Sequence, residues 1–553
     1  MDSDENQEFG SMADSDEECL LSLELLESDA HYQLKKKLMK LKGLDFPGVY
    51  FKTSNPDWKN ETVKKLLRIA RIIHLDEVDL YFDGNDGSAT DENCSSRNEI
   101  AALNAVRSVV DDALRSAPAF RIGMLQGLRD SLISKIHEFA ENNRQEIALI
   151  DNIDCGIEKL LQWGEKNGAI IKLQIANIEG AGRGAIAMED LNVGDIALEL
   201  PISMIIKEEL VHKSDMFHVL KKIKGMSSET MLLLWTMREK HNNHSAFKSY
   251  FDSLPEVFNT GLSFRIDAIL TLDGTLLLEE IMQAKEHLRA QFDEMFPSLC
   301  DNHPDIFPPE FYTWEQFVWA CELWYSNSMR IKFSDGKLQG CLIPIAGFLN
   351  HSLNPNIIHY GKVDTATDSL KFPLSKPCCK GEQCCLSYGN FSNSHFITFY
   401  GFIPQGDNPY DVIPLDFDVA TEDGTLLSDW KAHMVRGTWL SKNHDIFYYG
   451  LPPPLLDLLR NARSPSSPTK TLTRENLEIE LEVLEDLSAT FTGMMLNLEE
   501  TELDNSETSS WDVKLALKYK NLQREIISSV LTSCQTGHQM VRNELSKLPL
   551  CGS

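Results

Sequence analysis

The strongest constraint on the fold of this sequence is a set of short strand-like segments that a long helical stretch divides into two blocks. Residues 170–178 alternate apolar and polar side chains, and 186–200 continue in strand-like pieces. The stretch 207–332 that follows has a helical pattern. Later strand-like segments are 342–345, 357–360 and 384–388. This order predicts an α+β domain in which two groups of short strands flank a helical insert.

The chain of 553 residues is too long for one hydrophobic core, so we expect further domains beside this one. Residues 1–30 are predicted to be a disordered acidic tail, because they hold eleven acidic residues and no lysine or arginine. Residues 31–155 are predicted to form a helical accessory region with one apolar stripe. That stripe consists of Ile100, Leu103, Val106 and Val110. The mixed domain is expected at 156–405, and a second helical domain at 406–553.

Charge and composition exclude several classes of function. The chain has 83 acidic and 53 basic residues, a formal net charge of −30. Nucleic-acid binders gain most of their affinity from basic side chains on phosphates, so we expect no direct nucleic-acid partner. No apolar run reaches the length of a membrane helix, so we expect no membrane partner either. The N-terminus lacks the basic, apolar pattern of a secretion signal, which favours the cytosol or nucleus.

Two polar motifs are candidates for ligand binding. Gly182-Arg183-Gly184 lies in a predicted strand-to-strand turn, where glycines let a backbone approach a ligand closely. The same pattern is also typical of an ordinary tight turn. Asn350-His351 follows an apolar run, where its side chains either bond to local backbone or hold a ligand. Each motif alone leaves both interpretations open.

Two tyrosines, Tyr388 and Tyr400, make a third candidate. Both are followed by glycine, and tyrosines at such spacing are often core residues with satisfied hydroxyls. The functional alternative is a narrow aromatic slot whose phenol is directed at a nitrogen nucleophile.

In their order along the chain, these motifs resemble the SET-domain protein methyltransferases. The similar branch is that of Rubisco large-subunit lysine methyltransferase and actin-histidine methyltransferase. The resemblance also uses Leu160, Trp163, Gly168, Gly194-Asp195, Leu200-Pro201, 231–240, 245–255 and 326–330. It implies a SET fold with a pseudoknot, a helical insert, all-α domains at both ends, and a Rubisco-methyltransferase-like substrate-binding domain at 406–553.

The resemblance also implies a cofactor and roles for single residues. The cofactor would be S-adenosylmethionine. Its contacts would come from Gly182, Arg183, Gly184, Arg330, Asn350, His351 and Tyr388. Tyr388 matches the catalytic tyrosine of the family, and Tyr400 matches a second tyrosine near cofactor and substrate. The chain departs from the family at Gly347, where the family has an acidic residue, and at Met329, where it has serine.

No metal is expected. Four of the twelve cysteines form two adjacent pairs, Cys378-Cys379 and Cys384-Cys385. Neighbouring residues of a strand point to opposite faces, and adjacent cysteines rarely share one tetrahedral zinc.

The sequence therefore predicts a protein methyltransferase that acts on a lysine of a non-histone protein. Histidine methylation is one alternative. The other, which Gly347 keeps open, is an inactive SET protein that binds the cofactor and acts as an interaction module.

Overall fold

The computed structural model describes residues 19–44, 46–51, 56–83, 95–144, 147–150, 155–415, 430, 432–437, 443–463, 470–498 and 509–548. The chain divides into two compact units. The first contains residues Met1–Glu77 and Gly87–Asn143, and the second contains Val78–Asp86 and Arg144–Ser553. No helix among the described residues is long and apolar enough to cross a membrane.

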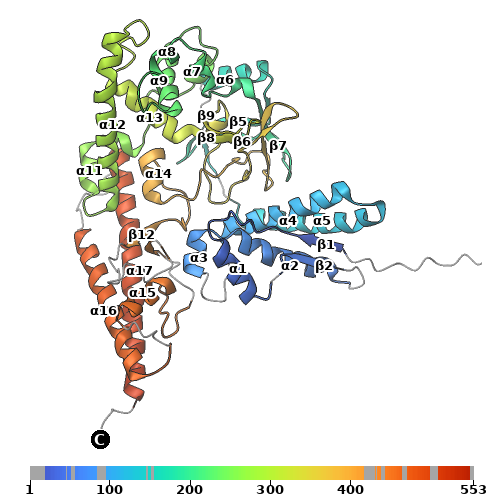
Figure 1. Ribbon diagram of the computed structural model, residues 1–553, viewed down its shortest axis with the longest axis vertical. Coiled ribbons are helices and arrows are strands. Elements are labelled where there is room, and N and C mark those ends of the chain that lie inside the picture. The colour runs from blue at the N-terminus through green and yellow to red at the C-terminus, as the bar shows by residue number, and fades with distance from the viewer. Residues whose placement is uncertain are drawn as a thin grey trace, which may run out of the picture. The chain divides into compact units, whose positions relative to one another are not determined.

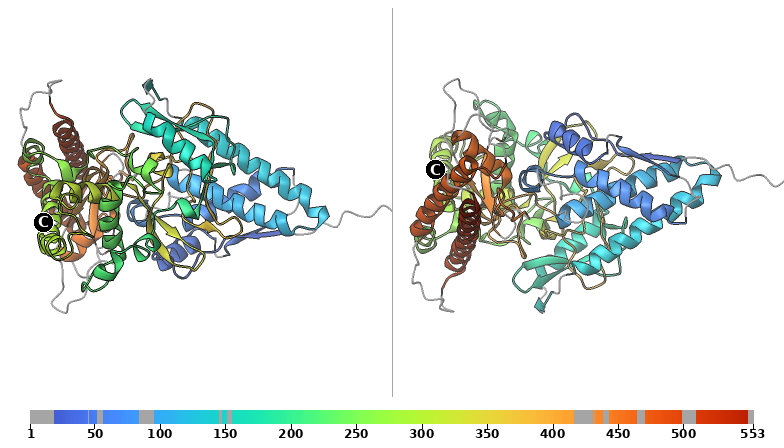
Figure 2. Two further views of the ribbon diagram at one scale, coloured as in Figure 1. Left: turned by 90° about the horizontal axis from the view of Figure 1, so that it is seen from above. Right: turned by 90° about the horizontal axis from the view of Figure 1, so that it is seen from below.

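The first unit is mainly helical. Its elements are β1 (Cys19–Ser22), α1 (Tyr32–Leu41), β2 (Gly48–Phe51), α2 (Trp58–Ile73), α4 (Ser96–Ser116) and α5 (Ala119–Asn142). Ser95 caps α4 by accepting a hydrogen bond from the Asn98 amide, as N-cap serines do. Figure 2 shows α4 and α5 side by side, and α2 packs against both. The predicted apolar stripe of α4 is fully buried, which confirms that its helical period was identified correctly.

One strand of the first unit lies inside the stretch predicted as an acidic tail. Residues 1–18 fall outside the described residues, but β1 (Cys19–Ser22) pairs antiparallel with β2. Cys19 and Leu21 face the core, while Leu20 and Ser22 face outward. This two-residue alternation buries apolar side chains, so the predicted disorder is wrong for residues 19–22.

The second unit contains several small sheets. Its strands are β3 (Leu149–Ile150), β4 (Ile170–Ile171), β5 (Leu173–Ile178), β6 (Gly182–Ala187), β7 (Ile196–Pro201), β8 (Ser328–Lys332), β9 (Leu338–Leu342), β10 (Val363–Asp364), β11 (Ser369–Pro373), β12 (Val412–Leu415) and β13 (His433–Arg436). The sheet orders are β3-β5-β6, β10-β11-β7-β4, β8-β9 and β12-β13. The predicted strand at 384–388 is wrong as a regular strand. That segment makes isolated bridges at Gln383 and Leu386 instead.

Those bridges place the 383–386 segment between two distant parts of the chain. The Cys384 amide donates to the Ala185 carbonyl at 2.8 Å, on the β6 side. The Leu386 amide donates to the Asn350 carbonyl at 2.9 Å, on the other side. The backbone that leads to Tyr388 is therefore fixed between β6 and the Asn350 segment, which brings the three predicted motifs together.

The predicted insert is helical. The helices of the second unit are α3 (Glu77–Asp83), α6 (Cys155–Lys166), α7 (Glu209–His212), α8 (Phe217–Leu220), α9 (Ser228–Lys240), α10 (Lys248–Phe251), α11 (Ile266–Thr271), α12 (Leu276–Asn302), α13 (Trp314–Asn327), α14 (Asn393–Tyr400), α15 (Pro453–Arg463), α16 (Arg474–Asn497) and α17 (Trp511–Lys547). Along the chain, helices α7 to α13 come after β7 and before β8, and Figure 1 shows α11 and α12 to one side of these strands.

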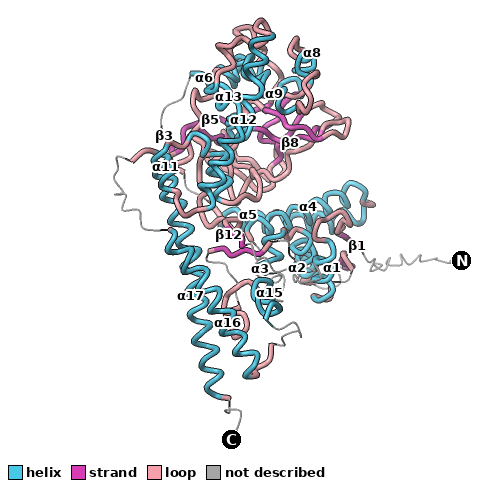
Figure 3. The backbone as a smooth tube through the Cα atoms, turned by 60° about the vertical axis from the view of Figure 1, so that its left-hand side comes forward, coloured by secondary structure: helices cyan, strands magenta, loops and turns pink. Residues whose placement is uncertain are grey.

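The C-terminal part ends in two long helices, α16 and α17, which lie side by side (Figures 1 and 3). Their facing residues form one apolar core with α15. A buried ion pair crosses this core, because Arg460 of α15 donates to both carboxylate oxygens of Glu480 at 2.5 and 2.8 Å. Figure 1 also shows α14 next to α17, which connects the strand-rich part to this helical end.

Candidate active site

Residues 179–181 form the turn that connects β5 to β6. The motif Gly182-Arg183-Gly184 was predicted in this turn, but it forms the start of β6 and pairs with β5. Residues 179–184 are called the glycine turn below. Gly180 and Gly182 have φ values of +73° and +68°, and an added Cβ would meet nothing within 4 Å at either position. Open space therefore lies over this turn. A Cβ on Gly184 would instead lie 2.5 Å from Ile178 Cδ1 and 2.8 Å from Asn350 Nδ2. A side chain at 184 would therefore displace the ends of Ile178, Asn350 and Gln383.

Arg183, between these glycines, is fixed by the insert and by an aromatic ring. Its guanidinium donates to the Ser253 carbonyl at 2.6 Å and lies 5.1 Å from the centre of the Phe348 ring. Its own carbonyl accepts a hydrogen bond from Asn350 Nδ2 at 3.2 Å. The predicted residues Arg183, Gly184 and Asn350 therefore meet.

His351 connects this group to the catalytic candidate. The backbone N–H of Tyr388 donates to His351 Nδ1 at 3.1 Å. A ring nitrogen that accepts carries no proton, so the neutral imidazole holds its proton on Nε2. The segment before His351 contains a strained residue, Ile345, whose φ is +71°. A β-branched residue in this region is an outlier, and such outliers concentrate at functional sites.

Tyr388 and Tyr400 form the predicted aromatic pair. Their rings are stacked with centroids 4.9 Å apart. Burial raises the pKa of Tyr388 above its usual value, with a smaller contribution from Tyr400. Burial, followed by Tyr360, raises the pKa of Tyr400 to about 12. Both phenols therefore keep their protons at neutral pH.

Tyr360 is a third tyrosine at this site, which the sequence analysis missed. Its hydroxyl donates to the Ser387 carbonyl at 2.9 Å. Electrostatic interaction with Tyr360 also raises the pKa of both Tyr388 and Tyr400. The available signal was its place ten residues after Asn350, at the end of a predicted strand. That pattern alone does not distinguish it from a core aromatic residue.

The structure does not gather Arg330 with the other predicted cofactor residues. Its side chain is 74% exposed and its guanidinium lies 3.8 Å from Glu229. It lies on β8, whose alternation buries the next residue, Ile331, and leaves Arg330 on the outer face. The residue beside Gly347 is Asn327, at the end of α13, whose Oδ1 is 3.0 Å from an ideal Cβ on that glycine.

The paired cysteines lie in the loop before Tyr388. Cys378 and Cys384 are fully buried. A hydrogen bond with Cys378 and burial raise the pKa of the Cys384 thiol well above its usual value, and burial raises that of Cys385 to about 12. These thiols are therefore protonated. Within the described ranges, no group of three or more His, Cys, Asp or Glu side chains could hold a metal ion.

Comparison with known proteins gives one domain match. A family model described as Rubisco LSMT substrate-binding matches residues 26–120. The match falls on the stretch that we expected to be an accessory region, whereas we expected a domain of this kind at 406–553. The assignment of 406–553 stays a prediction.

Two relatives named as methyltransferases each match more than half of the chain. The ribulose-1,5 bisphosphate carboxylase/oxygenase large subunit N-methyltransferase of Pisum sativum is 24% identical over 335 residues, covering 58% of this chain and 66% of the relative. The actin-histidine N-methyltransferase of Gallus gallus is 22% identical over 333 residues, covering 59% and 54%. The match thus spans two thirds or less of each relative.

A solved structure completes the comparison. The crystal structure of the SET domain of LSMT bound to lysine and AdoHcy aligns with a TM-score of 0.53 and 18% identity, covering 72% of this chain and 96% of that one. The resemblance predicted from the sequence is therefore confirmed: the chain has the SET fold, and its similarity is to the Rubisco LSMT and actin-histidine methyltransferase branch.

Proposed function

We propose that this chain is an S-adenosylmethionine-dependent protein methyltransferase that acts on a lysine of a non-histone protein. The observation that supports this best is the meeting of the glycine turn, Asn350-His351 and two stacked tyrosines. These come from segments about two hundred residues apart at the extremes, held together by the bridges of 383–386. The relatives are named for methyl transfer to proteins, and the solved neighbour holds lysine and AdoHcy.

The residues at the site fit such a cofactor. The turn at Gly182 has open space above it, and Gly184 lets Asn350 reach the turn. Arg183, Asn350 and His351 would hold the cofactor beside Tyr388, while their mutual hydrogen bonds keep the site ordered before binding. When bound, S-adenosylmethionine supplies an electrophilic methyl group.

The chain's own residues then prepare the acceptor. A lysine arrives protonated, since its usual pKa is about 10.4. Burial beside the stacked rings of Tyr388 and Tyr400 disfavours the ammonium form and lowers that pKa. The Tyr388 hydroxyl orients the amine, and holding the two reacting atoms in line removes much of the barrier.

Two alternatives have specific support. The similarity to an actin-histidine methyltransferase favours histidine as the acceptor. Gly347, which lacks the family's carboxylate, favours an inactive cofactor-binding module. As further parts of the proposal, the protein acts in the cytosol or nucleus, and it needs no nucleic-acid or membrane partner.

The first experiment measures cofactor binding by calorimetry. We expect a one-to-one complex with S-adenosylmethionine that Asn350→Ala weakens at least tenfold, because the amide bridges the turn and the His351 segment. Absence of binding to the wild-type protein up to millimolar cofactor would contradict the proposal.

The second experiment measures methyl transfer from tritiated cofactor to lysate proteins, followed by mass spectrometry of the modified residue. Tyr388→Phe is expected to slow single-turnover transfer about 10²-fold, the scale of one lost transition-state hydrogen bond. Tyr448→Phe, which removes a hydroxyl from the core of α15–α17, is the matched control and should transfer at the wild-type rate. A modified histidine would select the first alternative. Cofactor binding without any transfer would select the second.

A further inference from the structure

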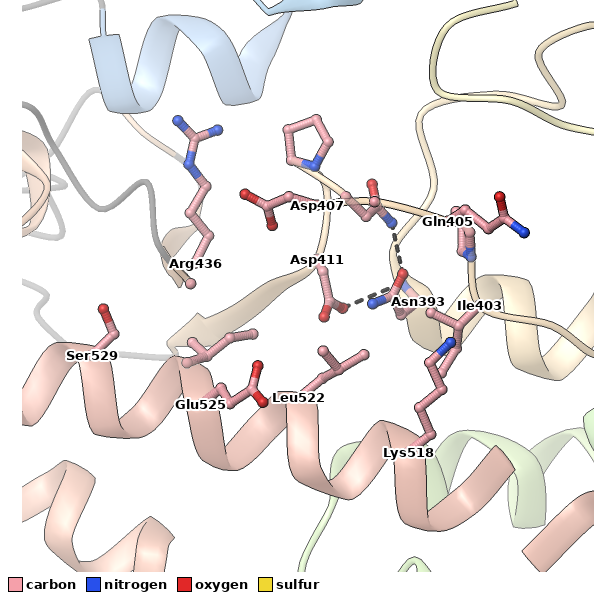
Figure 4. A pocket seen from close by; sticks show the side chains of 16 residues that line it. Asn393, Ile403, Gln405, Asp407, Asp411, Arg436, Lys518, Leu522, Glu525 and Ser529 are labelled. Atoms are coloured by element: carbon pink, nitrogen blue, oxygen red, sulfur yellow. Dashed lines mark hydrogen bonds between the residues drawn. The ribbon is translucent and has the colours of Figure 1, made fainter. Parts of the chain in front are cut away.

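A cavity of about 430 Å³ lies between the strand-rich part and the C-terminal helices of the second unit. Its walls come from the start of α14, the loop 403–411, the end of β13 and one face of α17 (Figure 4). Helix α17 contributes residues at three-to-four spacing, the period of a single helical face. These residues are Lys518, Leu522, Glu525, Ile526 and Ser529.

The floor of the cavity is a preorganised polar cluster. Asn393, Asn408 and Asp411 are only 3%, 6% and 8% exposed, yet all three line the cavity. Asn408 Nδ2 donates to Asn393 Oδ1 at 2.9 Å, and the backbone N–H of Asn393 donates to Asp411 Oδ1 at 3.3 Å. These bonds fix the Asp411 carboxylate at the bottom of the cavity, as Figure 4 shows.

The cavity collects negative charge around that floor. Asp407 and Glu525 line it together with Asp411. Burial raises the pKa of Asp411 to about 6, and Asp407 adds to the shift against the hydrogen bonds of Asn393. Among the described residues, Lys518 and Arg436 also line the cavity, and Tyr519 interacts electrostatically with both Asp411 and Glu280.

Neither of the two cationic side chains in the described lining forms an ion pair with Asp411. The Arg436 guanidinium lies 4.1 Å from the centre of the Phe82 ring of α3, and Figure 4 shows it extended away from Asp411. Lys518 is an exposed residue near the other end of the cavity, beside Ile403 (Figure 4). A buried carboxylate is costly without a cation, so this arrangement favours a cation from outside.

The dimensions exclude a small metal ion and suit an organic cation. Metal ions need oxygens that converge to about 2.0–2.6 Å, and the described residues contain no such group. The volume lies within the usual range of ligand pockets, roughly 300–1,000 Å³. Ile403, Leu522 and Ile526 offer an apolar wall to a hydrocarbon stem, and the carboxylates offer acceptors to its charged end.

The cavity is also within reach of a peptide held at the two tyrosines. Asn393 begins α14 and Tyr400 ends it, seven residues later. At about 1.5 Å per residue the two ends lie about 10 Å apart along the helix. An extended peptide covers that distance in about three residues, at roughly 3.3 Å each.

We propose that this cavity binds the guanidinium or ammonium side chain of an arginine or lysine of the substrate protein, about three residues from the methylated residue. The link to the methylated residue rests on the proposed function, whereas the binding of the cationic side chain does not.

Direct binding tests the cavity without catalysis. The probe is Nα-acetyl-arginine methylamide, with the lysine analogue as a second arm and the neutral citrulline analogue as the control. The readout is the NMR shift of the ¹³C-labelled methyl groups of Ile403, Leu522 and Ile526. Both cationic probes should shift these signals, and citrulline should shift them at least tenfold less at equal concentration. Equal responses to the charged and neutral probes, or none, would overturn the proposal.

Variants then assign the effect to the carboxylates. Asp407→Asn and Glu525→Gln change exposed rim residues and should each weaken arginine binding several-fold, and together at least tenfold. Glu485→Gln, the same charge change on an exposed site of α16 outside the cavity, is the matched control and should have no effect. Unchanged binding in the double variant would overturn the assignment of the cavity.

A peptide library tests the link to methylation. Tritiated methyl transfer is measured on degenerate peptides with a central lysine or histidine. Wild-type protein should prefer arginine or lysine about three positions from the centre, and the double variant should lose this preference. Transfer without a positional preference would overturn the inference and leave the methyltransferase proposal intact. Cofactor binding without transfer to any peptide, combined with a response to the arginine probe, would refute the activity and leave the cationic site intact.

Discussion

Replacing Gly401 by alanine is expected to destabilise the second unit by about 3–5 kcal/mol, from backbone strain and from a collision. Gly401 ends α14 with a φ of +77°, and its N–H donates to the Phe396 carbonyl at 2.8 Å. An added Cβ would lie 1.6 Å from the Asn259 carbonyl oxygen, which belongs to the backbone of the insert. No rotamer change can relieve such a contact.

The two costs can be worked out separately. Alanine in the left-handed region costs about 1–2 kcal/mol. The insert loop can retreat only by moving Thr260, whose hydroxyl donates to the buried Glu322 at 2.7 Å. Loss of a hydrogen bond to a charged group costs about 1.5–3 kcal/mol more. Gly336, with a φ of +82° and no atom within 4 Å of an added Cβ, carries the first cost without the second.

Urea denaturation of matched variants measures the difference. Gly336→Ala should lose about 1–2 kcal/mol and Gly401→Ala clearly more. Asparagine tolerates the left-handed region, so Gly336→Asn should be nearly neutral while Gly401→Asn keeps the collision. Methyl transfer should fall in Gly401→Ala as well, because Tyr400 is the preceding residue. Equal losses at the two positions would refute the reasoning that the insert fixes the end of α14.

Two further predictions concern buried charge. Asp411→Asn should stabilise the protein at pH 8, since the shift from 3.8 to about 6 corresponds to about 3 kcal/mol before any lost hydrogen bond. A carboxyl whose pKa rises on folding costs stability as pH rises. The free energy of unfolding that the variant gains over the wild type, measured by urea denaturation, should therefore grow by about 1 kcal/mol from pH 5 to pH 8. A gain independent of pH would contradict this. Glu480→Ala should cost about 3–5 kcal/mol because it removes the buried carboxylate that pairs with the buried Arg460 and leaves only the more exposed Asp457 as an ionic partner. Asp486→Ala, at an exposed ion pair on the same helix, should cost less than about 1 kcal/mol. Equal losses in the two variants, compared by urea denaturation, would refute the burial argument.

Local patterns were the reliable part of the sequence. The period of Ile100, Leu103, Val106 and Val110 depends on neighbouring residues only, and all four side chains are buried as predicted. The prediction of a disordered tail at 1–30 failed at residues 19–22 because their order depends on a distant part of the chain. The strand β1 owes its order to pairing with β2, almost thirty residues away, and the acidic composition of the segment gave no sign of that partner.

The sequence named several residues that the structure brings together, but their geometry was less predictable. The resemblance pointed to Asn350, His351 and Tyr388. The residue that faces Gly347 depended instead on the register of the chain after α13. Asn327 ends α13 and Arg330 lies three positions later on β8, so the passage from helix to strand determines which one faces Gly347. The cationic cavity could not be predicted at all, because its walls come from parts of the chain as far apart in sequence as Asn393 and Ser529.

Two unfavourable features of the second unit lie next to the two proposed sites. Ile345 has a φ of +71°, a conformation that costs about 1–3 kcal/mol, and five residues later the chain reaches Asn350. Asp411 is a buried carboxylate at the floor of the cavity. Proteins keep local violations of this kind mainly where function requires them. If both features persist because they serve binding, the cofactor should relieve the strain at Ile345 and the arginine probe the cost of the buried Asp411 carboxylate. The cation of the probe lowers the pKa of Asp411 and leaves Ile345 unaffected. The stabilising effects of the two ligands should then be additive, as expected for separate sites without shared contacts.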